Sequence, residues 1–204
     1  MTKRKIVIAG GTGFVGQGII KCLDTNQYDI HSLSRHPFKG EHKEVHYHVI
    51  DLKDTRQLEK ILDGADWVID AIGILFANPR KNQTYQKNSI EPAKALINGV
   101  QKDQKTKFLF ISANTAPFFL KDYIKAKREV ERYGFEQLKN RQHVVYPGLI
   151  YDKDRREIFY LGKAISLFSS VNFVTKCRVI QRKDFALEVK SILEEKSSYL
   201  ENKI

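Results

Sequence analysis

The stretch Ile6-Val7-Ile8-Ala9-Gly10-Gly11-Thr12-Gly13-Phe14-Val15-Gly16 joins an apolar run to closely spaced glycines. The run is typical of a buried parallel strand that ends at Ala9, and the apolar residues after Gly13 recur at helical spacing. Glycines there allow a sharp turn, close approach of the backbone to a pyrophosphate, and close packing of helix on strand. The helix would direct its N-terminus at the phosphates.

We therefore predict a dinucleotide site, with a tight turn that binds no ligand as the alternative. Its predicted cofactor-binding residues in this stretch are Gly10, Thr12, Gly13, Phe14, Val15 and Gly16.

The length of the chain and its cysteine content indicate how many domains to expect and which kinds of site to exclude. A chain of 204 residues is expected to form one domain with a modest appendage. Cys22 and Cys177 lie far apart and lack the spacing of a redox or zinc site, so we predict no metal site and a reducing, cytoplasmic setting. No stretch approaches the ~20 apolar residues of a membrane span, although peripheral membrane contact stays open.

The formal net charge of +11 raises the question of nucleic-acid binding. The lysines and arginines are scattered, and no RNA-binding motif accompanies them. A solvated surface that also attracts an anionic cofactor is the simpler explanation of the charge, so a nucleic-acid partner is not favoured. We expect a small-molecule substrate and a monomer or homodimer.

Apolar runs alternate with helical patterns along most of the chain. The strand candidates are 5–9, 29–33, 45–50, 66–72, 107–112 and 143–146, and the helix candidates are 14–23, 55–62, 88–103 and 121–139. This alternation predicts an α/β fold with a doubly wound parallel sheet, the Rossmann fold, over residues 1–151. Residues 77–87 are predicted to form a surface loop near the strand ends.

Residues 152–204 are too short for an independent core. We expect a short C-terminal helical extension within the same compact unit, with a closing helix at 184–195. The apolar residues Phe159, Leu161, Ile165 and Phe168 are expected to cover the substrate end, although ordinary core packing is the simpler role for such residues.

The end of the second strand candidate bears on cofactor choice. An NAD site usually places a carboxylate there to hold the ribose hydroxyls, but this strand ends in Ser34-Arg35. The missing carboxylate removes repulsion toward a 2′-phosphate, and Arg35 offers a planar, permanently charged partner for it. NADP is therefore favoured over NAD, with an unengaged loop cation as the alternative for Arg35.

The next two strand ends complete the predicted cofactor side. Asp51-Leu52 follows the third strand, where a carboxylate can accept hydrogen bonds from an adenine amino group, or cap the helix that begins near Asp54. The small residues of Ala71-Ile72-Gly73 let the backbone pass close to the bound ribose and nicotinamide.

Candidate catalytic residues follow the fifth strand. Tyr123 and Lys127 are four residues apart on a predicted helix and so share one face. A nearby ammonium favours ionisation of the phenol, which suits proton exchange with a carbonyl or alcohol, and the lysine also reaches ribose hydroxyls. Ser112, at the strand end, is placed to hydrogen-bond the same substrate oxygen.

Together these motifs resemble the short-chain dehydrogenases/reductases of the extended or atypical kind, the NAD-dependent epimerase/dehydratase-like proteins, including the branch related to the 39 kDa subunit of complex I. The resemblance covers about 1–151 and includes Asn88, Glu129, Glu131 and the run Tyr146-Pro147-Gly148-Leu149-Ile150-Tyr151. It implies cofactor binding by the glycine loop, Arg35, Tyr146 and Pro147. It also implies that Ser112, Tyr123 and Lys127 form the catalytic set.

These observations lead to one main hypothesis and two alternatives. The main one is an NADP(H)-preferring oxidoreductase that transfers hydride to or from a small or lipophilic carbonyl or alcohol, with Tyr123 as acid/base. The alternatives are a non-catalytic NAD(P)-binding redox sensor or assembly protein, and a nucleic-acid-associated protein.

Overall fold

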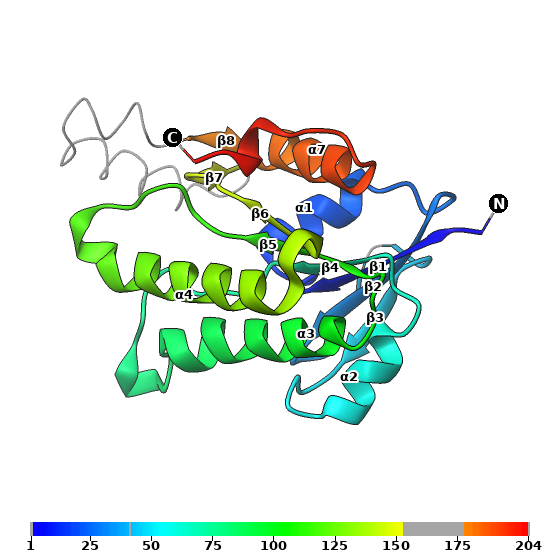
Figure 1. Cartoon of the computed structure of the whole chain (residues 1–204), viewed down its shortest axis with the longest axis horizontal. Helices are drawn as coiled ribbons and strands as arrows, with labels where there is room; N and C mark the ends of the chain where they lie inside the picture. Colours follow the sequence, from blue (N-terminus) through cyan, green and yellow to red (C-terminus); the bar gives the residue numbers. More distant parts are fainter. Residues whose placement is uncertain (1, 41, 153–177, 204) are drawn as a thin grey trace.

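A six-stranded parallel sheet forms the centre of the computed structural model, which describes residues 2–40, 42–152 and 178–203 (Figure 1). The strand order is β3-β2-β1-β4-β5-β6, and every neighbouring pair is parallel. This is the order of a doubly wound dinucleotide-binding sheet, so the predicted fold class is confirmed. The strands are β1 (Arg4–Ala9), β2 (Tyr28–Ser34), β3 (His46–Val49), β4 (Trp67–Asp70), β5 (Lys107–Ile111) and β6 (Gln142–Val145).

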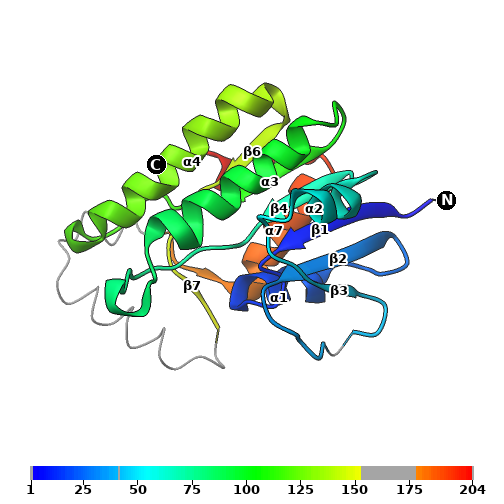
Figure 2. The same ribbon diagram turned by 90° about the horizontal axis from the view of Figure 1, so that it is seen from below.

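Helices cover both faces of the sheet (Figures 1 and 2). One face carries α1 (Phe14–Cys22) and α7 (Arg182–Leu193), and the other carries α2 (Thr55–Leu62), α3 (Glu91–Gln101) and α4 (Lys121–Leu138). Short elements connect them: η1 (Pro79–Lys81), η2 (Gln86–Ile90), η3 (Phe118–Leu120), η4 (Lys139–Arg141) and η5 (Tyr199–Glu201), with a two-stranded sheet of β7 (Ile150–Tyr151) and β8 (Ile180–Gln181).

Two apolar cores follow from this layering. Strands buried on both faces have nearly continuous apolar sequences, and successive side chains enter opposite cores. On β1, Ile6 and Ile8 pack with α1 and α7, whereas Val7 and Ala9 pack in the core that includes α2 and α3. The apolar run 6–9 therefore contributes side chains to both cores.

The observed elements refine several predicted boundaries. The predicted helix 88–103 is split into the π-helical turn η2 and α3, and Pro92 lies in the first turn of α3, where a missing N–H is tolerated. The predicted loop 77–87 contains η1 and an antiparallel bridge between Asn78 and Gln83. The helix predicted at 184–195 is α7 and begins two residues earlier.

The C-terminal extension contributes directly to the core. Phe185, Val189 and Ile192 of α7 are buried in the core formed by α1 and one face of the sheet. The described part of the extension therefore covers a sheet face. The segment predicted to cover the substrate end, with Phe159 to Phe168, lies outside the described residues, as does Cys177. No helix in the described ranges has the length and apolar character needed to cross a bilayer.

The fold predicts effects of different size for two substitutions on α1. A Cβ at Gly16 would lie 2.4 Å from the Gly10 carbonyl oxygen and 2.6 Å from the Gly11 Cα, so the backbone itself would have to move. We expect Gly16→Ala to lower the free energy of unfolding by about 1–3 kcal/mol in urea denaturation.

Gly18→Ala is the matched control on the same helix. Its Cβ would lie 2.6 Å from the Arg182 Cγ, so that side chain has to change rotamer, but no backbone atom has to move and alanine improves helix propensity, so we expect a smaller loss of stability. Equal destabilisation by both substitutions would mean that the tight contact at Gly16 does not constrain the fold.

Candidate active site

The glycine loop brings β1 against the end of β4. Gly10 has a φ of +78°, and a Cβ there would lie 2.9 Å from the Ala71 carbonyl oxygen and 3.2 Å from the Ile72 side chain. Only glycine satisfies both the backbone conformation and this approach. The structure thus places Ala71 and Ile72, two of the predicted cofactor-binding residues, beside the glycine loop.

The N-terminus of α1 is shaped for an anion. Gly13 is the N-cap, no side chain caps it, and a Cβ there would meet only the Gly10 carbonyl oxygen within 4 Å. Thr12, Phe14 and Val15 lie in the same turn, and the Arg182 guanidinium lies 4.7 Å from the centre of the Phe14 ring. The loop therefore leaves room at a positive helix end, which fits a pyrophosphate group.

The ends of β2 and β3 hold the predicted ribose and adenine residues. The Ser34 hydroxyl donates to the His36 carbonyl at 2.8 Å, while Arg35 is exposed. Asp51 is exposed and accepts from the Lys53 N–H at 3.0 Å. The helix cap of α2 is Asp54, so the alternative cap role of Asp51 is wrong.

Lys127 links the ends of β4 and β5. It is buried, and its Nζ donates to the Ile111 carbonyl at 2.7 Å. A Cβ at Gly73 would lie 3.5 Å from that Nζ, so the ammonium stands beside the predicted nicotinamide strand end. Tyr123 lies one helical turn earlier, with its ring centre 5.8 Å from the same nitrogen. The structure therefore brings Gly73, Tyr123 and Lys127 together.

The electrostatics of Tyr123 differ from the sequence expectation. The pKa of this phenol is raised to about 12, mainly by burial and then by the nearby Tyr85, against the opposing charge of Arg128. Burial also lowers the pKa of Lys127, against the attraction of Asp70 and Glu131. The prediction that the lysine depresses the tyrosine pKa is wrong for this structure, because desolvation dominates and the one nearby cation that lowers the pKa, Arg128, does not offset it.

Ser112 belongs to a hydrogen-bonded cluster that the sequence analysis missed. Its hydroxyl donates to the Glu131 carboxylate and accepts from the Arg128 guanidinium at 3.3 Å. Arg128 also pairs with Glu131 and donates to the Ala113 and Asn114 carbonyls at 2.9 and 3.0 Å. To contact a substrate oxygen, the Ser112 hydroxyl would have to give up its hydrogen bond with Glu131 or with Arg128.

Tyr146 lies against the same cluster. Its ring centre is 5.5 Å from the Arg128 guanidinium and 4.7 Å from the Lys203 ammonium, and Lys203 pairs with Glu131 at 2.9 Å. Burial, followed by the Glu131 charge, raises the pKa of Tyr146 to about 12. The neighbouring Pro147 accepts the Asn114 N–H through its carbonyl at 3.0 Å.

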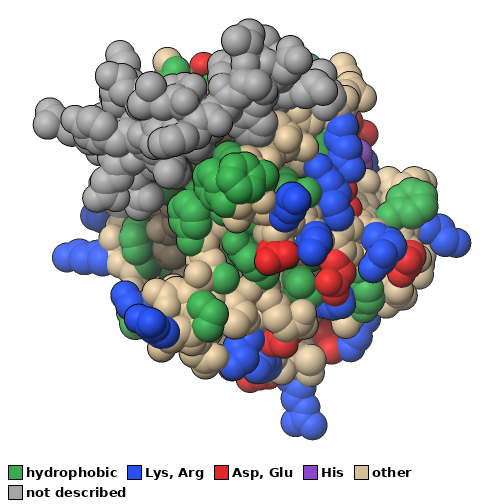
Figure 3. All heavy atoms as spheres, turned by 90° about the vertical axis from the view of Figure 1, so that its left-hand side faces the viewer, with side chains coloured by type: hydrophobic (Ala, Val, Ile, Leu, Met, Phe, Trp, Pro, Cys, Tyr) green, Lys and Arg blue, Asp and Glu red, His purple; other side chains and the backbone are tan. Residues whose placement is uncertain are grey.

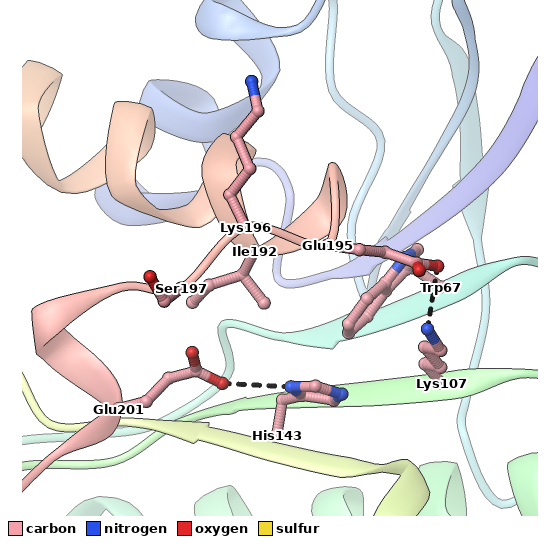
Figure 4. A pocket seen from close by; sticks show the side chains of 8 residues that line it. All are labelled: Trp67, Lys107, His143, Ile192, Glu195, Lys196, Ser197 and Glu201. Carbon is pink, nitrogen blue, oxygen red and sulfur yellow. Dashed lines mark hydrogen bonds and ion pairs between the residues drawn. The ribbon is translucent and has the colours of Figure 1, made fainter.

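The pocket drawn in Figure 4 lies away from these residues. Trp67 and Lys107 begin β4 and β5, so the pocket is at the amino-terminal edge of the sheet. Its charged groups are paired: Lys107 with Glu195 at 2.8 Å, and His143 with Glu201 at 3.0 Å. None of the predicted site residues is among its lining residues.

Asp70 is a second group that the sequence analysis missed. It is fully buried at the end of β4, its Oδ1 accepts from the Ile72 N–H at 2.9 Å, and its Oδ2 has no hydrogen-bond partner within the described structure. Burial raises its pKa to about 6, although the Lys127 charge opposes the shift.

The raised pKa of Asp70 predicts that the stability of the fold depends on pH. Between about pH 4 and pH 6 the folded state holds a proton that the unfolded state has released, so stability falls as pH rises through this window. The loss is on the order of 3 kcal/mol, because the pKa rises from 3.8 to about 6 and one pKa unit corresponds to about 1.4 kcal/mol. Urea unfolding at several pH values should show this slope in the parent and a flatter one in Asp70→Asn. The exposed Asp63→Asn is the control and should keep the parent slope.

Comparison with known proteins identifies the family and the fold of the chain. The model of the NAD dependent epimerase/dehydratase family matches residues 6–119. A curated relative is MIOREX complex component 2 of Saccharomyces cerevisiae, which is 23% identical over 209 residues, covering 76% of this chain and 75% of that protein.

Several solved structures share the fold. UDP-N-acetylglucosamine 4-epimerase from Bacillus cereus has a TM-score of 0.69 at 16% identity, covering 96% of this chain and 75% of its own. ElxO with NADP bound has a TM-score of 0.68 at 16% identity, with 97% and 94% covered. MoeE5 in complex with UDP-glucuronic acid and NAD has a TM-score of 0.70 at 13% identity, with 91% and 71% covered.

These likenesses establish a Rossmann-like fold seen with NADP in one protein and with NAD in another. The family model covers more than half of the sequence and includes the glycine loop and the first five strands of the sheet. The chain therefore belongs to the NAD dependent epimerase/dehydratase family.

Proposed function

We propose that this protein is an NADP(H)-preferring oxidoreductase of the short-chain dehydrogenase/reductase type, acting on a small or lipophilic carbonyl or alcohol. The observation that carries the proposal is the position of Lys127, whose ammonium stands beside Gly73 with Tyr123 one turn earlier on α4. A bound nicotinamide cofactor would supply or accept the hydride at this strand end. The protein's own groups would then manage the substrate proton.

The fit of the cofactor rests on the loop and the strand ends. The glycine loop offers open space at the N-terminus of α1, and Lys127 is placed to reach ribose hydroxyls beside Gly73. At the end of β2, no carboxylate follows Ser34, and Arg35 is exposed and free to pair with a 2′-phosphate. These features support NADP over NAD.

The pKa of Tyr123 sets its protonation state at neutral pH. A phenol with a pKa of about 12 stays protonated near neutral pH, so it can donate a proton to a carbonyl oxygen as that oxygen gains negative charge. Oxidation of an alcohol would need the phenolate, which burial disfavours. We therefore infer that Tyr123 is protonated at neutral pH and serves as the proton donor in carbonyl reduction.

Apolar side chains near α4 support a lipophilic substrate. Phe118 and Phe119 of η3 directly precede α4 and are 78% and 54% exposed, and Phe76 follows β4 and is 50% exposed. Figure 3 looks onto the side of the molecule toward which β1 runs, and it shows hydrophobic side chains exposed among lysines and arginines. Such surfaces on a monomer often mark binding sites.

A non-catalytic NAD(P)-binding protein is the second candidate. The Ser112 hydroxyl is already engaged by Glu131 and Arg128, and the yeast relative is named as a component of a complex. Under this proposal the cofactor would bind and the Tyr123–Lys127 pair would stay unused. Identification of the copurifying dinucleotide, followed by a screen of carbonyl substrates, separates the two candidates.

Arg35→Ala tests the cofactor preference. Loss of a charge-assisted contact worth ~1.5–3 kcal/mol should weaken NADPH binding roughly tenfold or more and leave NADH binding unchanged in calorimetry. Lys39→Ala, another exposed cation in the same loop, is the control and should change neither affinity much. Equal losses for both cofactors with Arg35→Ala would show that Arg35 does not contact the 2′-phosphate.

Tyr123→Phe tests the catalytic assignment. It should retain the fold and NADPH binding but lower turnover by ~10²- to 10⁴-fold, the usual contribution of general acid catalysis. Lys127→Ala should weaken both binding and turnover because it removes a cofactor contact and the charge near the phenol. Tyr133→Phe makes the same chemical change farther along α4, where the hydroxyl contacts Asn98, and should stay active. A fully active Tyr123→Phe variant would contradict the proposed mechanism.

A further inference from the structure

A cluster of histidines and one aspartate lies on β2 and β3, the two strands at one edge of the sheet. Asp29 and His31 alternate on β2, and His46 and His48 alternate on β3, so each pair lies on one face of its strand. The register pairs His31 with His46. Pairing therefore brings four potential ligands together from two short segments.

The donor atoms of three of these residues converge. The His31 Nε2 lies 3.2 Å from the Asp29 Oδ2, and the His46 Nε2 lies 3.3 Å from the Asp29 Oδ1. One ligand atom from each residue lies within 4.8 Å of the other two. Nitrogen and oxygen ligands ~2.0–2.1 Å from a tetrahedral Zn²⁺ are about 3.3 Å apart, so small side-chain rotations would suffice for binding.

His48 provides the outer contact that metal-binding histidines need. Its Nε2 lies 2.9 Å from the His31 Nδ1, and the two rings are stacked with centroids 5.1 Å apart. If the His31 Nε2 binds a metal ion, its Nδ1 carries the proton and donates to His48. Such partners fix the tautomer and orientation of the ligand ring.

We propose that Asp29, His31 and His46 form a binding site for a divalent transition-metal ion, with Zn²⁺ as the fitting ion. Two imidazoles and a carboxylate suit Zn²⁺, whereas Ca²⁺ and Mg²⁺ prefer sites built from oxygen alone. The side chains of His31, Asp29 and His46 are 15%, 38% and 59% exposed, which leaves access for the ion and an open position for water.

The charged groups around the proposed metal site have opposite effects on a cation. Lys5 of β1 pairs in register with Asp29 and repels a cation, but its ammonium is held by the Asp63 carbonyl at 2.7 Å. The Asp29 carboxylate supplies the opposite charge within the site itself. The site therefore needs direct coordination, since general electrostatic attraction would not hold a cation here.

A metal ion bound at the proposed site would link the two strands at one edge of the sheet. Within the described sheet, β3 pairs only with β2, so it is the edge strand. Coordination by Asp29 and His31 on one strand and His46 on the other would cross-link the two. The site lies near the amino-terminal ends of the strands, away from Ser34 and Arg35, so its function is separate from cofactor binding.

Calorimetry with Zn²⁺ on the chelator-treated full chain tests the proposal. We expect one saturable site in the parent protein. Replacement of a ligand by His46→Gln or Asp29→Asn should weaken binding by more than about tenfold, and His48→Phe, which keeps a stacking ring but removes the acceptor, by about tenfold. The exposed His36→Gln is the matched control and should bind as the parent does.

Circular dichroism of each variant checks the fold, and both ligand substitutions are at partly exposed positions. Co²⁺ gives a second measurement, since its visible absorption should be intense in the parent and weak in His46→Gln. Absence of saturable Zn²⁺ binding in the parent would overturn the proposal. Unchanged affinity in both folded ligand variants would overturn it equally, because the ion would then bind elsewhere.

Discussion

The close contact between the main chains at Gly10 and Ala71 governs the arrangement of this molecule. The Ala71 N–H donates to the Ala9 carbonyl, and the Gly10 N–H donates to the Leu33 carbonyl, so β1 is tied to both neighbours at its last residues. Beyond this point the chain after β1 enters α1 on one face, and the chain after β4 leads toward α3 on the other. The crevice between diverging connections is where doubly wound sheets bind ligands.

Most of the fold could be predicted because its signals are local. An apolar strand, a glycine turn and a helical repeat each occupy one short segment, and their alternation restricts the topology. The close placement of Gly73 and Ser112 at one edge was also predictable, because carboxyl ends of neighbouring parallel strands share an edge, whereas the reach of Lys127 to Gly73 depends on how α4 packs. The split of the helix at η2 was not, because a π-helical turn depends on packing around Asn88 and Thr84.

The parts that escaped prediction depend on distant residues. The burial that raises the pKa values of Asp70 and Tyr123 depends on segments far apart in the sequence, and for Tyr123 it reverses the expected pKa shift of the phenol. The partners of Ser112 lie on α4, although the three-residue spacing of Arg128 and Glu131 is a usable signal for an ion pair. The histidine cluster needs the register of β2 with β3, which sequence periodicity alone does not give.

The packing of α7 on α1 has a consequence for how the chain folds. The core around α2, α3 and α4 is formed from residues between Val7 and Val144, whereas the core on the other face includes Ile6 and Ile19 together with Phe185 and Val189. During synthesis the apolar face of β1 and α1 therefore emerges long before its cover. Contacts between such distant segments slow folding, and the nascent sheet needs protection from association until α7 has left the ribosome.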